Sequence, residues 1–243
     1  MPRSAWRSGS AARDAVRLAS RLALRQAARV STVVPTAVLM ATRSAGKLRE
    51  LGPMLEAAGW RAVDLSMRGI AERPDEEDAL ETSETFAGNA LAKARYFHAS
   101  SGLPTLADDS GLSCDALGGA PGVHSKRWSN RPELTGAALD AANNALLLSA
   151  LAEAARAGRA SRGARYVCAA AWVDGTREVV ALGETRGRIL ERAEGSGGFG
   201  YDPLFWSEEL GASFGVATRA EKGAVSHRAR AVAAVLEKVR EGS

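Results

Sequence analysis

The sequence is poor in cysteine, in aromatic residues and in long apolar runs. Its two cysteines, Cys114 and Cys168, have no CxxC partner and lie in apolar-leaning surroundings. This excludes a disulfide framework and a cysteine zinc site, so we expect two buried thiols in a reducing compartment. No apolar run approaches the roughly 20 residues of a membrane-spanning helix. We therefore expect a cytoplasmic protein without a membrane partner.

Aromatic residues make up only 5% of the 243 residues, whereas hydrophobic residues make up 46% and charged residues 25%. These proportions are those of an ordinary globular protein with enough apolar material for a sizeable core. Because aromatic side chains are scarce, that core must consist largely of Ala, Val and Leu.

Positive charge is concentrated at the N-terminus. Residues 1–33 carry seven Arg and one Asp, a net +6, so the remaining 210 residues contribute −2 to the total of +4. The body of the chain is therefore not basic, and we expect no nucleic-acid partner. We interpret residues 1–33 as an Arg-rich extension, disordered or loosely helical, and residues 34–243 as one folded domain. The extension is an Ala/Arg-biased tail or, alternatively, an organellar import signal.

Apolar periodicity in residues 34–243 alternates between strand-like and helix-like segments, which predicts an α/β protein. Asp174 and Gly175 predict a hairpin turn, Pro53 predicts a kink or an early helix stop, and the acidic run 75–78 predicts a solvated loop. Strands are expected at 33–42, 61–65, 103–107, 167–173 and 178–183. Helices are expected around Leu48, Leu51 and Leu55, at 85–100, at 133–157, and at the C-terminus with Val232, Val235, Leu236 and Val239 on one face.

The first candidate site is the loop between the first strand and the first helix. Such a loop directs backbone N–H groups and the positive helix end at one point, which suits a phosphate. It is not a Walker A loop, because Leu48 stands in place of Ser or Thr. The alternative is a surface helix capped by its serine. The loop consists of Thr42, Arg43, Ser44, Ala45, Gly46 and Lys47.

The second candidate is the sequence Asp108-Asp109-Ser110-Gly111 at the end of an expected strand. Successive side chains of a strand face opposite sides, so the two carboxylates can converge only where the strand breaks into a turn, as Ser110-Gly111 predicts. Carboxylates suit Mg²⁺, and one can activate a water molecule as general base. A plain Asp-Ser-Gly turn is the alternative.

The third candidate is the helix at 85–100, which places Asn89 and Lys93 one turn apart on the same face. A lysine at the edge of the apolar stripe can reach into a cleft, and Glu81 can add an oxygen ligand for a metal. The alternative is a surface lysine whose aliphatic stem alone is buried.

The fourth candidate is the glycine-rich stretch 195–203, which formally satisfies GxGxxG. Tyr201, Asp202 and Pro203 follow where a helix should begin, which argues against a dinucleotide-binding loop. We interpret the glycines as letting the backbone lie close to a flat ligand. Phe199 or Tyr201 could stack on a base, and Asp202 could accept its N–H groups. A glycine-rich turn is the alternative.

The fifth candidate combines Lys222 with Ser226, His227 and Arg228 at the start of the last helix. Ser226 is a good helix cap. Cationic side chains in the first turn oppose the helix dipole, so their placement is mildly unfavourable unless an anionic or electron-rich ligand binds. The alternative is an ordinary capped helix with exposed charges.

Five motifs, in their order along the chain, resemble the inosine triphosphate pyrophosphatase family over about residues 38–235. They are TxxxGK, ETxxTFxxNAxxKA, ADDSGLxxDALGGAPGVxSxRW, GFGYDP and KxxxSHR. The resemblance implies an elongated α/β fold with a long mixed sheet, flanking helices and two lobes around a cleft. It implies hydrolysis of ITP, dITP and XTP to the monophosphate and pyrophosphate, which cleanses the nucleotide pool. It also implies a requirement for Mg²⁺ and a homodimer.

By position, the resemblance implies that residues 42–47, Lys93 and Ser110 bind the triphosphate. Glu81 and Asp109 would hold the metal, and Asp109 would also accept the proton of the attacking water. Asp109 and Lys93 are thus the implied catalytic residues. The residues implied to enclose the base are Phe199, Gly200, Tyr201, Asp202, Lys222, His227 and Arg228.

The chain departs from the family pattern at three positions. Ser44 replaces a usual Asn, Ser83 a usual Gly, and Gly88 a usual Glu. The first change could weaken a phosphate or sugar contact, and the last could remove a carboxylate behind the site. Three alternatives stay open: a pyrophosphatase for another modified nucleotide, a nucleotide-binding regulator without catalysis, and a nucleic-acid-binding module that uses the Arg-rich tail.

Overall fold

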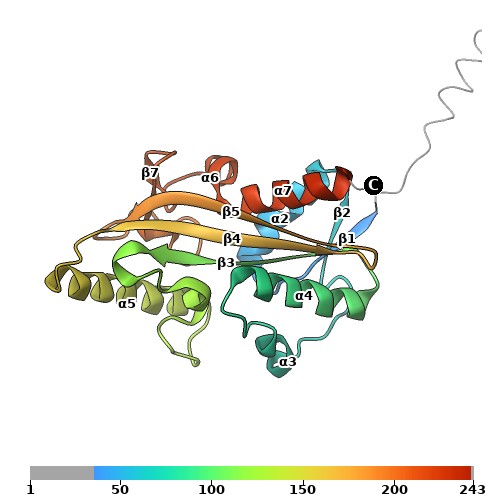
Figure 1. Ribbon diagram of the computed structural model, residues 1–243, viewed down its shortest axis with the longest axis horizontal. Helices are drawn as coiled ribbons and strands as arrows, with labels where there is room; N and C mark the ends of the chain where they lie inside the picture. Colours follow the sequence, from blue (N-terminus) through green and yellow to red (C-terminus); the bar gives the residue numbers. More distant parts are fainter. Residues whose placement is uncertain (1–35, 242–243) are drawn as a thin grey trace, which may run out of the picture. The chain divides into compact units, whose positions relative to one another are not determined.

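The computed structural model describes residues 36–241, and the predicted extension at residues 1–33 lies outside them. In the described part, seven strands form one open sheet in the order β2-β1-β3-β4-β5-β6-β7 (Figure 1). β1 is parallel to β2 and β3, and the remaining neighbours are antiparallel. The strands are β1 (Ala37–Met40), β2 (Arg61–Asp64), β3 (Thr105–Cys114), β4 (Gly163–Val173), β5 (Glu178–Ile189), β6 (Phe205–Ser207) and β7 (Ala212–Ser213).

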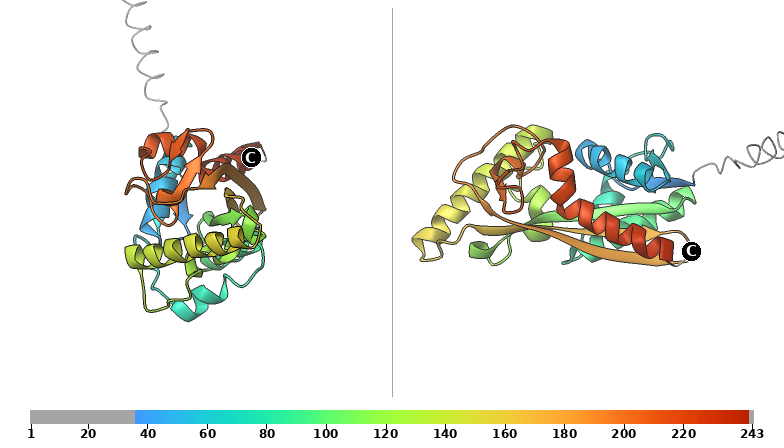
Figure 2. Two further views of the ribbon diagram at one scale, coloured as in Figure 1. Left: turned by 90° about the vertical axis from the view of Figure 1, so that its left-hand side faces the viewer. Right: turned by 90° about the horizontal axis from the view of Figure 1, so that it is seen from above.

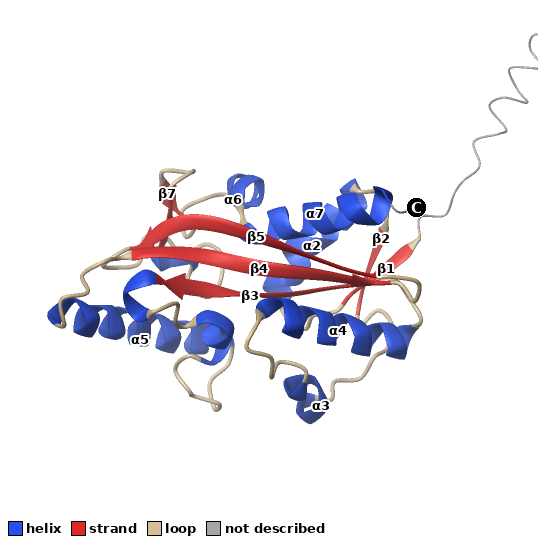
Figure 3. Ribbon diagram, viewed as in Figure 1, coloured by secondary structure: helices blue, strands red, loops and turns tan. Residues whose placement is uncertain are grey.

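Helices cover both faces of this sheet, which confirms the predicted α/β fold with a long mixed sheet. α2 and α7 lie on one face and α4 on the other (Figure 3). Seen from above, α2 and α7 lie side by side over the strands (Figure 2). The helices are α2 (Ala45–Ala57), α3 (Pro74–Ala79), α4 (Phe86–Ser101), α5 (Gly136–Arg156), α6 (Arg219–Val225) and α7 (His227–Glu241). Short 3-10 turns span Asp115–Leu117, Gly122–Arg127 and Asp202–Leu204.

Small residues in the central strands let the helices approach the sheet closely. Ala169, Ala170 and Ala171 of β4 are fully buried. At Gly183 of β5, a Cβ atom would lie 2.2 Å from the carbonyl oxygen of His227, so only glycine fits there. This close approach brings the first turn of α7 down onto the sheet. The predicted apolar face of α7 is confirmed, because Val232, Val235, Leu236 and Val239 are all buried.

Local capping signals explain why α4 begins and ends where the sequence predicts. The Thr85 side chain accepts a hydrogen bond from the backbone N–H of Gly88 at 3.1 Å. Gly102 ends the helix in the left-handed conformation with φ of 68°. The hairpin at Asp174–Gly175 is confirmed as well, since β4 and β5 pair from Val173 and Glu178 onwards.

Two local expectations need correction. Pro53 predicts a kink or an early stop, and the early stop is wrong, because α2 continues to Ala57. Leu51 and Leu55 on either side of the proline are fully buried. Their packing outweighs the backbone hydrogen bond that the proline removes. The acidic run 75–78 is helical, within α3, instead of a loop. Pro74 begins this helix and acidic side chains occupy its first turn, where both are favourable.

Candidate active site

The candidate site lies at the carboxyl end of β1, beyond which β3 no longer pairs with β1. β1 pairs with β3 only through Leu39 and Met40, opposite Thr105 and Leu106. β3 runs on to Cys114 with β4 on its other side. Beyond Met40 the chain leaves the sheet and enters α2, so a loop and a helix N-terminus border residues 108–110. Ligands of open α/β sheets bind at such carboxyl ends.

Asp108 and Asp109 lie within an unbroken strand and face opposite sides of the sheet. The expectation that they converge at a turn is wrong, because Ser110 and Gly111 stay paired with Cys168 and Val167 of β4. Asp108 therefore points toward α2 and α7, and Asp109 points toward α4. Each carboxylate is buried, with exposures of 1% and 7%. Each consequently needs its own cationic partners.

The Asp108 carboxylate is held by two cations from the helices above it. Its Oδ2 atom lies 3.0 Å from Nζ of Lys47 and accepts from Nε of Arg228 at 3.0 Å. Burial opposes ionisation of Asp108, but Lys47 and Arg228 outweigh burial and hold its pKa well below the ordinary value. Arg228 also donates to Ser110 Oγ at 2.7 Å. Asp108 is thus ionised, and it holds Lys47 and Arg228 in place beneath the site.

Asp109 belongs to a second group, formed with α4 and the segment before it. Lys93 donates to Glu81 Oε1 at 2.8 Å and to Asp109 Oδ1 at 3.3 Å. Asn89, one helical turn earlier, donates to Asp109 Oδ2 at 3.0 Å. Burial disfavours the charge on Lys93, but Asp109 and Glu81 outweigh it and raise the lysine pKa. The predicted shared face of Asn89 and Lys93 is confirmed.

The pair Glu81 and Asp109 has the chemistry of a Mg²⁺ site. Both carboxylates lie within hydrogen-bonding distance of one ammonium group, so the space between them already accommodates a cation. Hard oxygen donors from one or two carboxylates are what Mg²⁺ uses when phosphates and water supply the remaining ligands. Within residues 36–241 no three acidic, histidine or cysteine side chains gather into a ready metal site. A metal bound here would need oxygens from a substrate.

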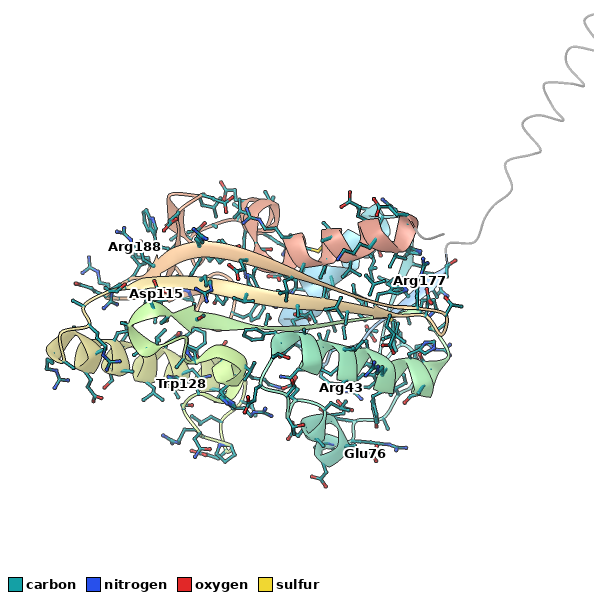
Figure 4. The ribbon with its side chains drawn as sticks, in the orientation of Figure 1. Arg43, Glu76, Asp115, Trp128, Arg177 and Arg188 are labelled. Carbon is teal, nitrogen blue, oxygen red and sulfur yellow. The ribbon has the colours of Figure 1, made fainter. Side chains whose placement is uncertain are left out.

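The loop before α2 leads into the N-terminus of that helix and lies next to these groups. Ser44 caps the helix, accepting from the Lys47 N–H at 3.4 Å, and Thr42 Oγ1 accepts from the Ser44 N–H at 3.1 Å. The Arg43 side chain takes a different direction: it binds Glu77 of α3 at 2.7 Å and lies between α3 and α4 (Figure 4). The loop therefore offers backbone N–H groups and Lys47, while the Arg43 guanidinium holds α3 in place.

The glycine-rich stretch brings Phe199 against the same loop. A Cβ atom on Gly46 would lie 2.7 Å from the Phe199 ring, so the ring rests directly on the start of α2. Lys222 Nζ lies 4.8 Å from the centre of that ring, and the Arg228 guanidinium carbon lies 5.7 Å from it. These cations face an aromatic surface, which stabilises them by cation–π attraction.

Asp202 and Lys222 form a buried ion pair behind Phe199. Lys222 Nζ lies 2.6 Å from Asp202 Oδ2, and the Phe199 N–H donates to the same oxygen at 2.8 Å. Tyr166 donates to Asp202 Oδ1 at 3.3 Å. Burial raises the pKa of Asp202 although Lys222 counteracts it. The carboxylate therefore fixes the loop and retains little free acceptor capacity.

His227 is buried and stacks on Tyr166, with ring centres 4.5 Å apart and an interplanar angle of 7°. Burial, together with the positive charges of Arg228 and Lys222, lowers its pKa well below the ordinary value. The imidazole is consequently neutral. Its Nδ1 atom is buried and, within the described residues, has no hydrogen-bond partner. It is a buried polar atom whose hydrogen-bonding capacity the described part of the chain leaves unused.

Tyr201 differs from its predicted role as a stacking residue. Its ring is 4% exposed within the core, and its hydroxyl donates to the Ser125 carbonyl at 2.8 Å. Of the two aromatic candidates, only Phe199 borders the charged cluster. The cysteines are buried as predicted.

Glu50 is a site residue that sequence reasoning missed. It follows Lys47 by three positions on α2 and binds Lys222 Nζ at 3.0 Å. It also pairs with the guanidinium of Arg228. Glu50 thereby connects the helix that begins at the phosphate loop with the two cations beside Phe199. The only local signal was the one-turn spacing from Lys47, since the apolar Leu48, Leu51 and Leu55 dominate the helix pattern.

Comparison with known proteins shows the family of the chain. A model of the Ham1 family matches residues 38–238. The chain is 42% identical over 206 residues to a dITP/XTP pyrophosphatase of Ralstonia nicotianae, covering 84% of this chain and 96% of that protein. It is 47% identical over 192 residues to a dITP/XTP pyrophosphatase of Frankia alni, covering 79% and 91%.

Solved structures match over a similar extent. A HAM1 protein from Coxiella burnetii superposes with a TM-score of 0.71 at 30% identity, covering 85% of this chain and 99% of that one. A dITP/XTP pyrophosphatase from Mycobacterium abscessus gives 0.60 at 41% identity, covering 83% and 99%. The resemblance drawn from the motifs is thus confirmed, and the chain belongs to the Ham1 family.

Proposed function

We propose that this protein hydrolyses non-standard purine nucleoside triphosphates, namely ITP, dITP and XTP, to the monophosphate and pyrophosphate. Relatives named dITP/XTP pyrophosphatase at 42% and 47% identity support this substrate class. Within the chain, the observation that carries the proposal is the group of Asp109, Lys93 and Glu81 beside the first turn of α2. Side chains suited to act as a general base, a phosphate-binding cation and a metal ligand lie together there.

Cleavage between the α- and β-phosphorus requires charge neutralisation and an aligned water molecule more than covalent attack. We assign to Asp109 the acceptance of the proton from that water. Lys93, Lys47 and the N–H groups at the start of α2 are assigned to the triphosphate. Burial and the nearby Asp108 raise the pKa of Cys168, so the thiol adjoining the site is a poor nucleophile.

Mg²⁺ is the proposed cofactor, with Glu81 and Asp109 as the residues that hold it. Bound there, it supplies charge neutralisation for the departing pyrophosphate. The chain's own contribution is to favour the ionised form of Glu81. Burial opposes the charge on Glu81, but Lys93 outweighs burial and lowers the Glu81 pKa.

The base is proposed to bind between Phe199, His227 and Arg228. A guanidinium carries five N–H donors, and three Arg228 nitrogens already serve Asp108, Glu50 and Ser110, so two donors remain. A 6-oxo purine offers an acceptor to such donors, whereas adenine presents a 6-amino donor and a bare N1. Committed buried hydrogen bonds reject a mismatched group by up to roughly 10⁴–10⁵-fold.

The homodimer and the cytoplasmic location are proposed for this chain as well. No helix within residues 36–241 is long and apolar enough to cross a membrane. Light scattering coupled to size exclusion gives the mass of the particle directly. A mass near twice 25.4 kDa supports the dimer, and a mass near 25.4 kDa removes it.

The deciding experiment compares turnover of ITP, dITP, XTP, GTP and ATP with Mg²⁺ and with EDTA. We expect pyrophosphate release from the first three, much slower release from GTP and ATP, and none with EDTA. Preference for a different modified nucleotide would favour the first alternative, a pyrophosphatase with another base pocket. Tight nucleotide binding without pyrophosphate release would favour the regulator.

A further inference from the structure

α5 lies outside the charged cluster, yet it binds the loop that carries Phe199. The Gly200 N–H donates to Asp140 Oδ2 at 2.8 Å. The Asn144 side-chain amide donates to the Gly200 carbonyl oxygen at 3.1 Å. Asp140 and Asn144 are four residues apart and therefore share one face of α5. Two consecutive turns of α5 thus bind both the N–H group and the carbonyl oxygen of Gly200.

Two further contacts anchor the same loop. The Phe199 N–H donates to Asp202 Oδ2 at 2.8 Å, and the Tyr201 hydroxyl donates to the Ser125 carbonyl at 2.8 Å. Gly200 adopts a positive φ of 63°, a conformation natural to glycine. Each of residues 199–201 therefore makes at least one anchoring hydrogen bond, and α5 provides those of Gly200.

Small movements of this backbone change what the Phe199 ring touches. The ring rests on Gly46 and faces the cations of Lys222 and Arg228. Cation–π attraction requires the cation within about 6 Å of the ring centre. Lys222 and Arg228 lie at 4.8 Å and 5.7 Å, so a displacement of about one ångström moves the guanidinium beyond that range.

We propose that Asp140 and Asn144 form a two-point clamp on Gly200 that sets the position of the Phe199 ring for nucleobase binding. They are positioning residues, because they contact the loop backbone and act through Phe199. The proposal rests on the proposed function in so far as Phe199 borders the base. It adds α5 to the parts of the fold that determine nucleotide affinity.

The test uses the full-length enzyme and the variants Asp140→Ala and Asn144→Ala. Loss of one such hydrogen bond is expected to raise the KM for ITP by roughly threefold to tenfold. We expect kcat to stay within about twofold, since the phosphate and metal residues are untouched. Asp140→Asn retains an acceptor oxygen and should recover most of the affinity. Glu153→Ala, which removes an exposed carboxylate from the same helix, is the matched control and should leave both constants unchanged.

A double-mutant cycle separates positioning from simple stabilisation. In a Phe199→Ala background, Asp140→Ala should raise KM no further, because the ring through which it acts is gone. Additive effects on KM in that background would overturn the proposal. So would an unchanged KM in both single variants of an active enzyme, while an inactive wild type would refute the proposed function instead.

Hydrogen–deuterium exchange gives a readout that needs no turnover. Asp140→Ala and Asn144→Ala should speed exchange in residues 198–202 of the nucleotide-free protein, with other segments unchanged. Exchange that is unaltered in both variants would overturn the clamp whatever the enzyme's activity. Exchange that rises throughout α5 as well would assign the contacts to general stability and overturn the positioning role.

Discussion

A Cβ atom on residue 88 would lie 2.2 Å from Oγ and 2.8 Å from Cβ of Ser83. Ser83 Oγ is itself bound, accepting from the Thr85 N–H at 3.2 Å, and its Cβ cannot be moved by rotating the side chain. Serine at 83 therefore requires glycine at 88. The two departures from the family pattern around α4 are consequently one coupled change, in which the Ser83 side chain fills the space beside Gly88.

This coupling predicts opposite effects of one substitution in two backgrounds. Gly88→Ala in the native chain should lower the melting temperature, since crowding of this kind costs about 1–3 kcal/mol. In a Ser83→Gly background the same substitution should raise it. Only Thr85 Oγ1, at 3.1 Å, then lies close to the added Cβ atom, and alanine favours a helix over glycine by up to about 1 kcal/mol. Thermal unfolding of the four proteins checks this. A stabilising Gly88→Ala in both backgrounds would contradict the coupling.

Lys47 and Lys93 contact opposite faces of the Asp108–Asp109 strand but are both assigned to the triphosphate. Lys47→Ala and Lys93→Ala should therefore reduce hydrolysis of ITP and XTP by similar factors, because both substrates share that group. Glu50→Gln, which alters the partner of Lys222 and Arg228, is the contrasting variant and should change the ITP/XTP ratio. If either lysine variant shifts that ratio by more than about tenfold, equivalent to ~1.4 kcal/mol, that lysine faces the base instead.

The ammonium of Lys93 occupies the space between Glu81 and Asp109. Two unit charges about 4 Å apart interact by about 4 kcal/mol at an effective dielectric of 20, so removing the lysine charge removes a repulsion of that size on a metal ion bound nearby. Lys93→Met should thus bind Mn²⁺ at least about tenfold more tightly than the wild type without nucleotide. Titration followed by electron paramagnetic resonance measures this, with Lys47→Met as the control that leaves the pair intact. Equal affinities of wild type and Lys93→Met would place the metal elsewhere.

The lowered pKa of His227 predicts that the folded protein loses stability in mild acid. Burial, Arg228 and Lys222 lower its pKa in the folded protein. Below the ordinary value of about 6.5 the unfolded chain binds a proton that the folded chain does not. The free energy of unfolding should therefore decrease from about pH 7 to pH 5, by at most about 1.4 kcal/mol per pH unit from this group. Urea unfolding at several pH values should give a shallower dependence for His227→Gln. Parallel curves would show that His227 does not contribute.

Local signals allowed the sequence to predict α4, α7 and the hairpin. Thr85 and Gly102 cap α4 through contacts within a few residues, and the apolar face of α7 follows from helical spacing alone. Lys93 and Asn89 were predictable for the same reason, since four-residue spacing fixes a shared face.

The features that the sequence could not predict depend on contacts between residues far apart in the chain. Ser110 and Gly111 have the composition of a turn, but β4 pairs with them from residues 168 and 167 and keeps them extended. Glu50 finds its partners Lys222 and Arg228 at separations of 172 and 178 residues, so no local pattern reports the contact. Tyr201 is likewise assigned to the core by Ser125, 76 residues earlier.

The most direct test of the central claim is the product of ITP hydrolysis by the wild type and by Asp109→Asn at saturating Mg²⁺. We predict that the wild type releases IMP and pyrophosphate, and that the folded Asp109→Asn protein is essentially inactive. A neutral amide at this position neither takes a proton from water nor holds the metal well. Release of inorganic phosphate by the wild type, or Asp109→Asn turnover within about tenfold of wild type (~1.4 kcal/mol of barrier), would contradict it.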